Sequence, residues 1–176
     1  MFIFDASALI AIFKEAGLPG LVAMLLKLDS DLVIPSNLWE HEILDPDTRG
    51  GLGRYVSEGS MRILVANTLE EIGKLRSEVS EPGAFVYGLG ELDVILTYKK
   101  HFSDMAVVRC ILDDEPARKL ASRLGIRFTG LLGLLDDLVD KGITDRDTID
   151  RTRERLKERG FRMRSVSKRG DPGRGV

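Results

Sequence analysis

Acidic side chains directly follow two apolar segments of the chain. Asp5 comes after Phe2–Phe4, and Asp113 and Asp114 come after Val107–Leu112. If both segments are strands of one parallel sheet, their carboxyl ends lie at the edge where such sheets bind ligands. The fold would then bring together acids that are more than 100 residues apart in the sequence.

Carboxylates gathered in this way repel one another, so the cluster needs a counter-charge. Two of them about 4 Å apart cost about 4 kcal/mol at an effective dielectric constant near 20. Mg²⁺ and Mn²⁺ prefer oxygen ligands and would neutralise the cluster. A bound dication can polarise a phosphodiester and lower the pKa of a coordinated water. The spacing of the acids therefore indicates metal-dependent hydrolysis of a nucleic acid backbone.

Short apolar segments alternate with stretches of helical spacing along the chain. The expected strands are 2–4, 32–34, 62–65, 107–112 and, as a weaker signal, 127–129. This alternation predicts a parallel sheet with helices on both faces. Ser36 or Asn37 can cap a helix that ends by Pro46. We interpret the glycine-rich stretch 49–54 and the stretch 80–90 as surface loops.

Length and composition predict one domain. The chain has 176 residues, of which 43% are hydrophobic, and a net charge of −2. We expect a single domain over residues 1–164, with closing helices at about 131–159, and a disordered basic tail at 165–176. Cys110 is the only cysteine, which excludes a disulfide framework and a cysteine-rich zinc site. No signal peptide or membrane-spanning segment is apparent, so we expect a cytoplasmic protein.

The charge is unevenly distributed between the two ends of the chain. Residues 151–176 carry a net charge of +7 and residues 1–150 carry −9. A basic end on an acidic body indicates a nucleic acid or another polyanionic partner. A solvated helix face explains the same charges equally well.

Four segments carry a resemblance to a known family. They are Phe4–Ile10 (FDASALI), Ile34–Ile43 (IPSNLWEHEI), Gly90–Ile95 (GELDVI) and Leu112–Arg118 (LDDEPAR), the last followed by Leu124–Gly130. Together they resemble the PIN-domain family of metal-dependent ribonucleases, which includes the VapC-type toxins, and in particular one prokaryotic branch of it. The resemblance covers nearly the whole chain and is weakest over 46–87. It implies a three-layer α/β/α fold with about five parallel strands.

The resemblance implies roles for individual side chains. The expected catalytic residues are Asp5, Glu42, Asp93 and Asp114. Of these, Asp5, Asp93 and Asp114 are the expected ligands of Mg²⁺ or Mn²⁺. Ser7 would hold Asp5 or a phosphate.

Each of the last three positions has a neighbouring acid as an alternative. Residues two apart on a helix do not face each other, so one acid of the pair Glu40 and Glu42 points elsewhere, and so does one of Glu91 and Asp93. The family pattern favours Glu42 and Asp93, although many relatives carry Glu at the position of Asp93. It also favours Asp114 over the adjacent Asp113.

The activity implied by the resemblance is that of an endoribonuclease acting on RNA. It further implies a toxin role, an antitoxin protein as partner and a homodimer. One alternative is a non-catalytic PIN-fold module that binds RNA or acts as a scaffold. The other is a different aspartate-based phosphohydrolase. We interpret Trp39 as a packing residue rather than a platform for base stacking.

Overall fold

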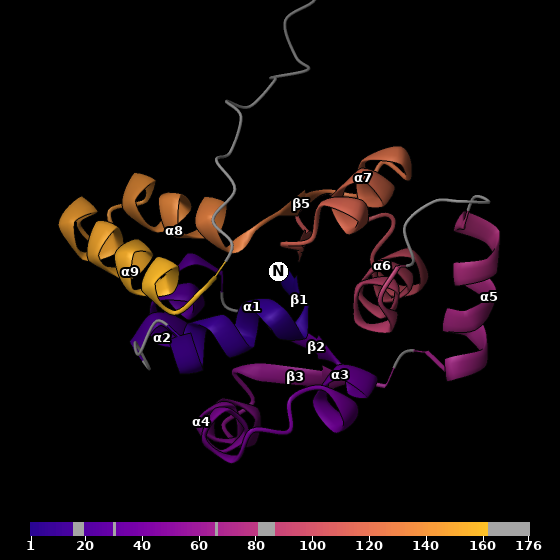
Figure 1. Ribbon diagram of the computed structural model, residues 1–176, viewed down its shortest axis with the longest axis horizontal. Coiled ribbons are helices and arrows are strands. Elements are labelled where there is room, and N and C mark those ends of the chain that lie inside the picture. Colours follow the sequence, from indigo (N-terminus) through magenta and orange to yellow (C-terminus); the bar gives the residue numbers. More distant parts are fainter. Residues whose placement is uncertain (16–19, 30, 66, 81–86, 162–176) are drawn as a thin grey trace, which may run out of the picture.

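The computed structural model describes residues 1–15, 20–29, 31–65, 67–80 and 87–161 (Figure 1). The tail expected at 165–176 lies outside these residues, as does part of the loop expected at 80–90. Within the described ranges, no helix has both the length and the apolar character needed to cross a membrane.

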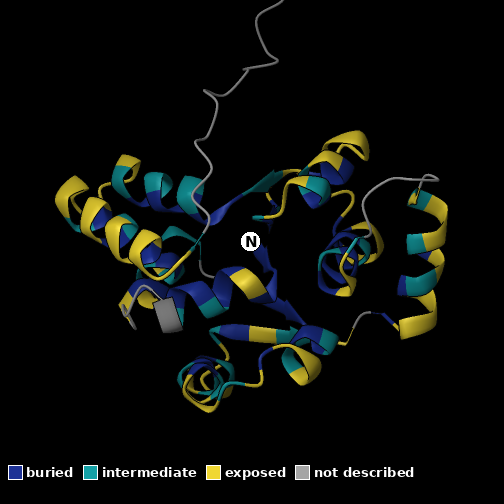
Figure 2. Cartoon of the chain, in the orientation of Figure 1, coloured by how far each residue is buried: buried dark blue, intermediate teal, exposed yellow. Residues whose placement is uncertain are grey.

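A five-stranded parallel sheet forms the centre of the molecule, with the strand order β3-β2-β1-β4-β5. The strands are β1 (Phe2–Phe4), β2 (Leu32–Pro35), β3 (Met61–Leu64), β4 (Arg109–Ile111) and β5 (Phe128–Thr129). Every residue of β1 and β2 is buried, whereas the outer sides of the helices are exposed (Figure 2). Strands of this kind are apolar on both faces because helices cover both.

The helices that cover the sheet are α1 (Ala6–Ile10), which continues as a π-helix η1 (Ala11–Glu15), α2 (Gly20–Leu28), α3 (Ser36–His41), α4 (Pro46–Ser57), α5 (Leu69–Val79), α6 (Leu89–His101), α7 (Glu115–Arg123), α8 (Leu131–Asp140) and α9 (Arg146–Glu158). On one face α6 contacts β1, β2 and β4, and α5 packs outside α6. On the other face η1 contacts α4 and α9, and α2 contacts α8. The fold is therefore the expected three-layer α/β/α arrangement.

The direction in which the chain winds across the sheet reverses between β1 and β4. Strands β1, β2 and β3 follow one another toward one edge, whereas β4 and β5 lie on the opposite side of β1. At such a switch point the connections leave neighbouring strand ends in opposite directions, and ligands bind in the crevice between them. Asp5 follows β1, and Asp113 and Asp114 follow β4, so all three lie at this position.

Residues 49–54 belong to a helix, so the interpretation of this stretch as a loop is wrong. Asp45 caps α4 by accepting a hydrogen bond from the backbone N–H of Thr48 at 3.0 Å, and Pro46 occupies the first turn. Both features favour a helix start. The start signal and the buried side chains of α4 therefore outweigh the low helix propensity of its glycines.

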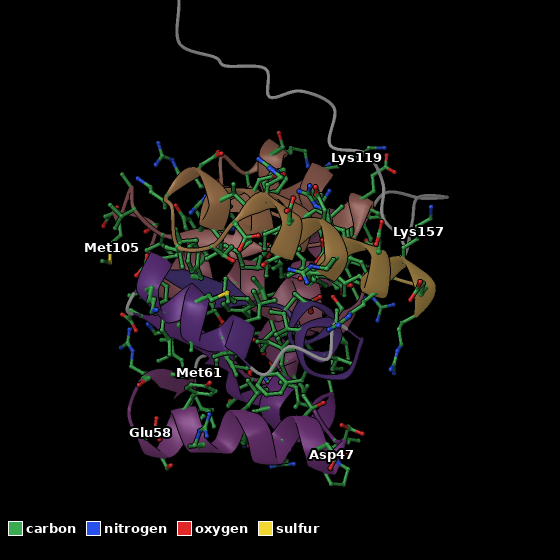
Figure 3. The ribbon with its side chains drawn as sticks, turned by 90° about the vertical axis from the view of Figure 1, so that its left-hand side faces the viewer. Asp47, Glu58, Met61, Met105, Lys119 and Lys157 are labelled. Atoms are coloured by element: carbon green, nitrogen blue, oxygen red, sulfur yellow. The ribbon has the colours of Figure 1, made fainter. Side chains whose placement is uncertain are left out.

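One of those glycines has a packing role. Figure 3 shows α4 as a continuous helix between the labelled residues Asp47 and Glu58. A Cβ atom at Gly51 would lie 2.9 Å from Cδ1 of Phe13 and closer still to its Cε1. The missing side chain thus allows the Phe13 ring of η1 to pack directly against α4.

Candidate functional site

Asp5 is the most deeply buried acid at the switch point. Its side chain is 3% exposed, and its backbone N–H donates to the carbonyl oxygen of Ile111 at 3.3 Å. The Ser7 hydroxyl donates to Oδ2 of Asp5. The pKa of Asp5 is raised from 3.8 to about 6, chiefly because burial disfavours the charged form; the negative charges of Glu42 and Asp113 act in the same direction, and the Ser7 hydrogen bond opposes the shift. The site therefore holds a carboxyl group that needs compensation when it ionises.

The two acids after β4 have different surroundings. Asp113 Oδ1 accepts hydrogen bonds from the Arg118 guanidinium at 3.1 Å and from the Leu131 N–H at 3.0 Å. Burial raises the pKa of Asp113, and these bonds act in the opposite direction. Asp114 is exposed and caps α7 through a 3.4 Å hydrogen bond from Ala117 N–H. Asp113 thus connects β4 to α7 and α8, whereas Asp114 is more accessible to a ligand.

Glu42 lies at the end of α3 and faces α6. A Cβ atom at Gly90 would be 2.6 Å from Oε1 of Glu42 and 2.8 Å from Cδ2 of Leu38, so Gly90 makes room for this carboxylate. Glu42 is accessible to solvent, yet partial desolvation raises its pKa, as do the charges of Glu91 and Asp93. Glu40 is exposed, and its Oε2 lies 4.0 Å from Nε2 of His41. Of the two glutamates on α3, Glu42 is the one that interacts with the other acids.

Asp93 on α6 belongs to a buried polar network. The side-chain amides of Asn37 and Asn67 donate to its two carboxylate oxygens at 3.1 Å and 2.5 Å, and Asn67 also donates to the Thr97 hydroxyl at 2.9 Å. Burial raises the pKa of Asp93, and the two asparagine bonds oppose this shift. The network connects α6 to α3 and to the segment before α5. Asn67 does not belong to any sequence motif that would have identified it as part of the site.

Glu91, two residues earlier on α6, interacts with the acids at the strand ends. Burial raises the pKa of Glu91, and so do the charges of Asp5 and Asp114. From the helical spacing, one acid of the pair Glu91 and Asp93 is expected to face solvent, and the resemblance favours Asp93 as the ligand. In the structure Asp93 is 1% exposed and bound by amides, while Glu91 is half-buried. Both remain candidates for the α6 ligand.

These acids are hard oxygen donors, and the negative charge of each disfavours ionisation of its neighbours. The site draws on four elements: the end of β1, the end of α3, the start of α6 and the end of β4. Across the described part of the chain, no group of three or more His, Cys, Asp or Glu side chains is arranged so that it could hold a metal ion. The acids nevertheless interact electrostatically across the sheet edge, since the charges of Glu42 and Asp113 act on Asp5 and those of Asp5 and Asp114 act on Glu91. Their oxygen donors are of the type that Mg²⁺ and Mn²⁺ prefer.

Comparison with known proteins agrees with this fold. A family model described as a PIN domain matches residues 1–168. No curated protein and no solved structure matches the chain. PIN domains typically use divalent metals, and they are generally nucleases. Since the matched region covers more than half of the sequence, the chain belongs to the PIN domain family.

Proposed function

We propose that this protein is a Mg²⁺- or Mn²⁺-dependent endoribonuclease that hydrolyses RNA phosphodiester bonds. The observation that carries the proposal is Asp5, a buried carboxyl group at the switch point of the sheet whose pKa is raised to about 6. An acid buried beside other acids is costly unless a positive charge compensates it. Membership of a family of metal-using nucleases supports the same conclusion.

The proposed ligands come from four elements. Asp5, Glu42 and Asp114 provide three carboxylates, and α6 provides a fourth through Glu91 or Asp93. The sequence resemblance favours Asp93. The electrostatic coupling favours Glu91, because the charges of Asp5 and Asp114 both raise its pKa, whereas both oxygens of Asp93 already accept amide hydrogen bonds.

The side chains around the ligands prepare them for their role. A bound dication would supply a more acidic water and polarise the phosphodiester. The Ser7 hydroxyl fixes Oδ2 of Asp5, and Arg118 and the Leu131 N–H hold Asp113 beside it. Asp5 must lose its proton before it can bind a cation, so we expect activity to rise with pH through about 6.

A cleavage and metal-binding assay tests the proposal. We expect the wild-type protein to bind Mn²⁺ saturably and to cleave a single-stranded RNA only when the cation is present. Asp5→Asn should abolish both properties without loss of the folded state. Glu42→Gln should do the same, whereas Glu40→Gln is its matched control, because Glu40 lies on the same helix and is exposed. Retained cleavage by Asp5→Asn, or a wild-type protein without saturable Mn²⁺ binding, would reject the proposal.

Two further comparisons refine the assignment. Glu91→Gln and Asp93→Asn distinguish the two candidates on α6. Only the substitution of the residue that binds the cation should lower Mn²⁺ affinity in proportion to the loss of cleavage. Hydrolysis of a small phosphodiester without cleavage of RNA would favour a different phosphohydrolase. Metal-independent RNA binding without cleavage would favour a binding module.

The family resemblance alone carries three finer proposals. These are a toxin role, an antitoxin protein that inhibits the site, and a homodimer. Expression in a bacterial host tests the first, since the wild-type protein should arrest growth and Asp5→Asn should not. Sedimentation of the purified protein tests the homodimer.

A further inference from the structure

A cation lies on the indole ring of Trp39, a residue of the helix that ends at Glu42. The guanidinium carbon of Arg49 is 5.1 Å from the centroid of this ring. Both side chains are half-buried. Within the described ranges no carboxylate forms an ion pair with Arg49, and the nearby Asp45 accepts hydrogen bonds from the N–H and hydroxyl of Thr48. The ring therefore orients a guanidinium that makes no ion pair with the described residues.

Helix geometry places this pair beside Glu42. Trp39 precedes Glu42 by three residues, so their side chains diverge by about 60° around the helix axis and are neighbours on its surface. Glu42 and Leu38 face Gly90 of α6. Trp39 therefore lies beside Glu42 on the side away from Asn37, which contacts Asp93, and its ring carries Arg49.

The proposed substrate makes a cation at this position useful. RNA is a polyanion, and the acids of the site repel it. An arginine can bind a phosphate through two parallel hydrogen bonds. Because the indole ring already restricts the guanidinium, less rotational freedom is lost when a phosphate binds.

We propose that Arg49, held by Trp39, binds a backbone phosphate of single-stranded RNA adjacent to the phosphodiester that is cleaved. This inference rests on the proposed ribonuclease function and adds a substrate-positioning residue to it. Trp39 then acts by orienting Arg49 rather than by stacking on a base. The contact recognises the backbone, so it contributes to affinity for any RNA sequence.

Two other arginines show why Arg49 is the candidate. Arg118 also lies at the site, but its Nε donates to the Leu112 carbonyl oxygen at 2.6 Å and its terminal nitrogen donates to Asp113. Arg54 lies five residues after Arg49 on α4, where its guanidinium carbon is 5.1 Å from the ring of the adjacent Tyr55. It borders a cavity of about 210 Å³ together with Phe13 and is exposed. Arg54 is thus a matched control with the same chemistry on another face of the helix.

Steady-state cleavage of a single-stranded RNA in Mn²⁺ tests the proposal with Arg49→Gln, Arg49→Lys and Arg54→Gln. We expect Arg49→Gln to raise KM at least about tenfold, because glutamine can keep at most one of the two hydrogen bonds to the phosphate and lacks the charge, with Mn²⁺ affinity unchanged. Its plot of log(kcat/KM) against log[salt] should be shallower by about 0.7, the change for one phosphate contact on a single strand. Arg49→Lys should restore the salt dependence but only part of the KM. Arg54→Gln should match the wild type.

Tryptophan fluorescence gives a readout that is independent of cleavage. Trp39 is the only tryptophan in the chain, so RNA added in EDTA should change the emission of the wild type and of Arg54→Gln, but much less that of Arg49→Gln. If Arg49→Gln and Arg54→Gln have equal KM, salt dependence and fluorescence response, the proposed role of Arg49 is wrong, while the ribonuclease function is not affected. A wild-type protein that neither binds nor cleaves RNA would overturn the ribonuclease function as well.

Discussion

Replacing Asp5 by Asn should stabilise the fold at neutral pH even though it removes a proposed metal ligand. The pKa of Asp5 rises from 3.8 to about 6 chiefly because burial disfavours the charged form. This difference corresponds to about 3 kcal/mol. Asn has nearly the shape of Asp and keeps an acceptor for the Ser7 hydroxyl, so the substitution mainly removes the charge.

The stabilisation should depend on pH in a defined direction. Below pH 3.8, Asp5 is neutral in both the folded and the unfolded chain, and the wild type and the variant differ only in local packing. As the pH rises toward about 6, the unfolded chain ionises first, so the wild type loses stability that the variant keeps. Above about pH 6 the difference should level off after a total increase of about 3 kcal/mol.

Urea unfolding in EDTA between about pH 3.5 and about pH 8 measures this difference. Glu40→Gln is the control, because removal of an exposed charge changes the free energy of unfolding little. With Mn²⁺ in place of EDTA, the wild type should become more stable and Asp5→Asn should not, since we expect only the wild type to bind the cation. A difference in stability that stays constant across the pH range would refute the assignment of a buried, desolvated charge to Asp5. So would a variant that becomes less stable relative to the wild type as pH rises.

Three further substitutions or modifications test other parts of the structure. Gly90→Ala should displace the Glu42 carboxylate and lower Mn²⁺ affinity in calorimetric titration more than it lowers the melting temperature; an unchanged affinity would contradict the close contact. Asn67→Ala should destabilise the fold by about 2 kcal/mol in urea unfolding, more at pH 8 than below pH 3.8, because buried Asp93 loses a donor to its charged form. Cys110 should resist alkylation, followed by mass spectrometry, until the protein unfolds, because its thiol is buried and burial raises its pKa; rapid labelling of the native protein would argue against this.

The strands could be predicted because burial on both faces leaves a simple pattern in the sequence. A strand covered by helices on both sides is continuously apolar, as β1 and β2 are. The acids at the strand ends followed from the same reasoning, because parallel strands share one carboxyl edge. The limits of β4 were less predictable, since Val107 is apolar yet 70% exposed and lies outside the strand.

Helix α4 shows where local propensity is misleading. Three glycines between Arg49 and Arg54 suggested a loop, because glycine is unfavourable inside helices. The contact between Gly51 and Phe13 joins residues that are distant in the sequence, so no local pattern could reveal that the glycine is needed for packing. This error also concealed the orientation of Arg49 toward α3.

The sequence alone could not decide whether Glu91 or Asp93 is the candidate ligand on α6, for a related reason. The helical period shows that two acids two residues apart point in different directions, but not which direction leads to the strand ends. That depends on how α6 lies on the sheet. Asn37 comes from α3 and Asn67 from the segment before α5, and only the assembled fold shows that both meet Asp93.

The bond from the Leu131 N–H to Asp113 has a consequence for the order in which the molecule is completed. Leu131 is the first residue of α8, so the acid after β4 gains this partner only when that helix docks. During synthesis from the amino terminus, every proposed ligand leaves the ribosome before α8 does. We therefore expect a nascent chain that ends before Leu131 to lack a finished reaction centre, although it already contains all of the acids.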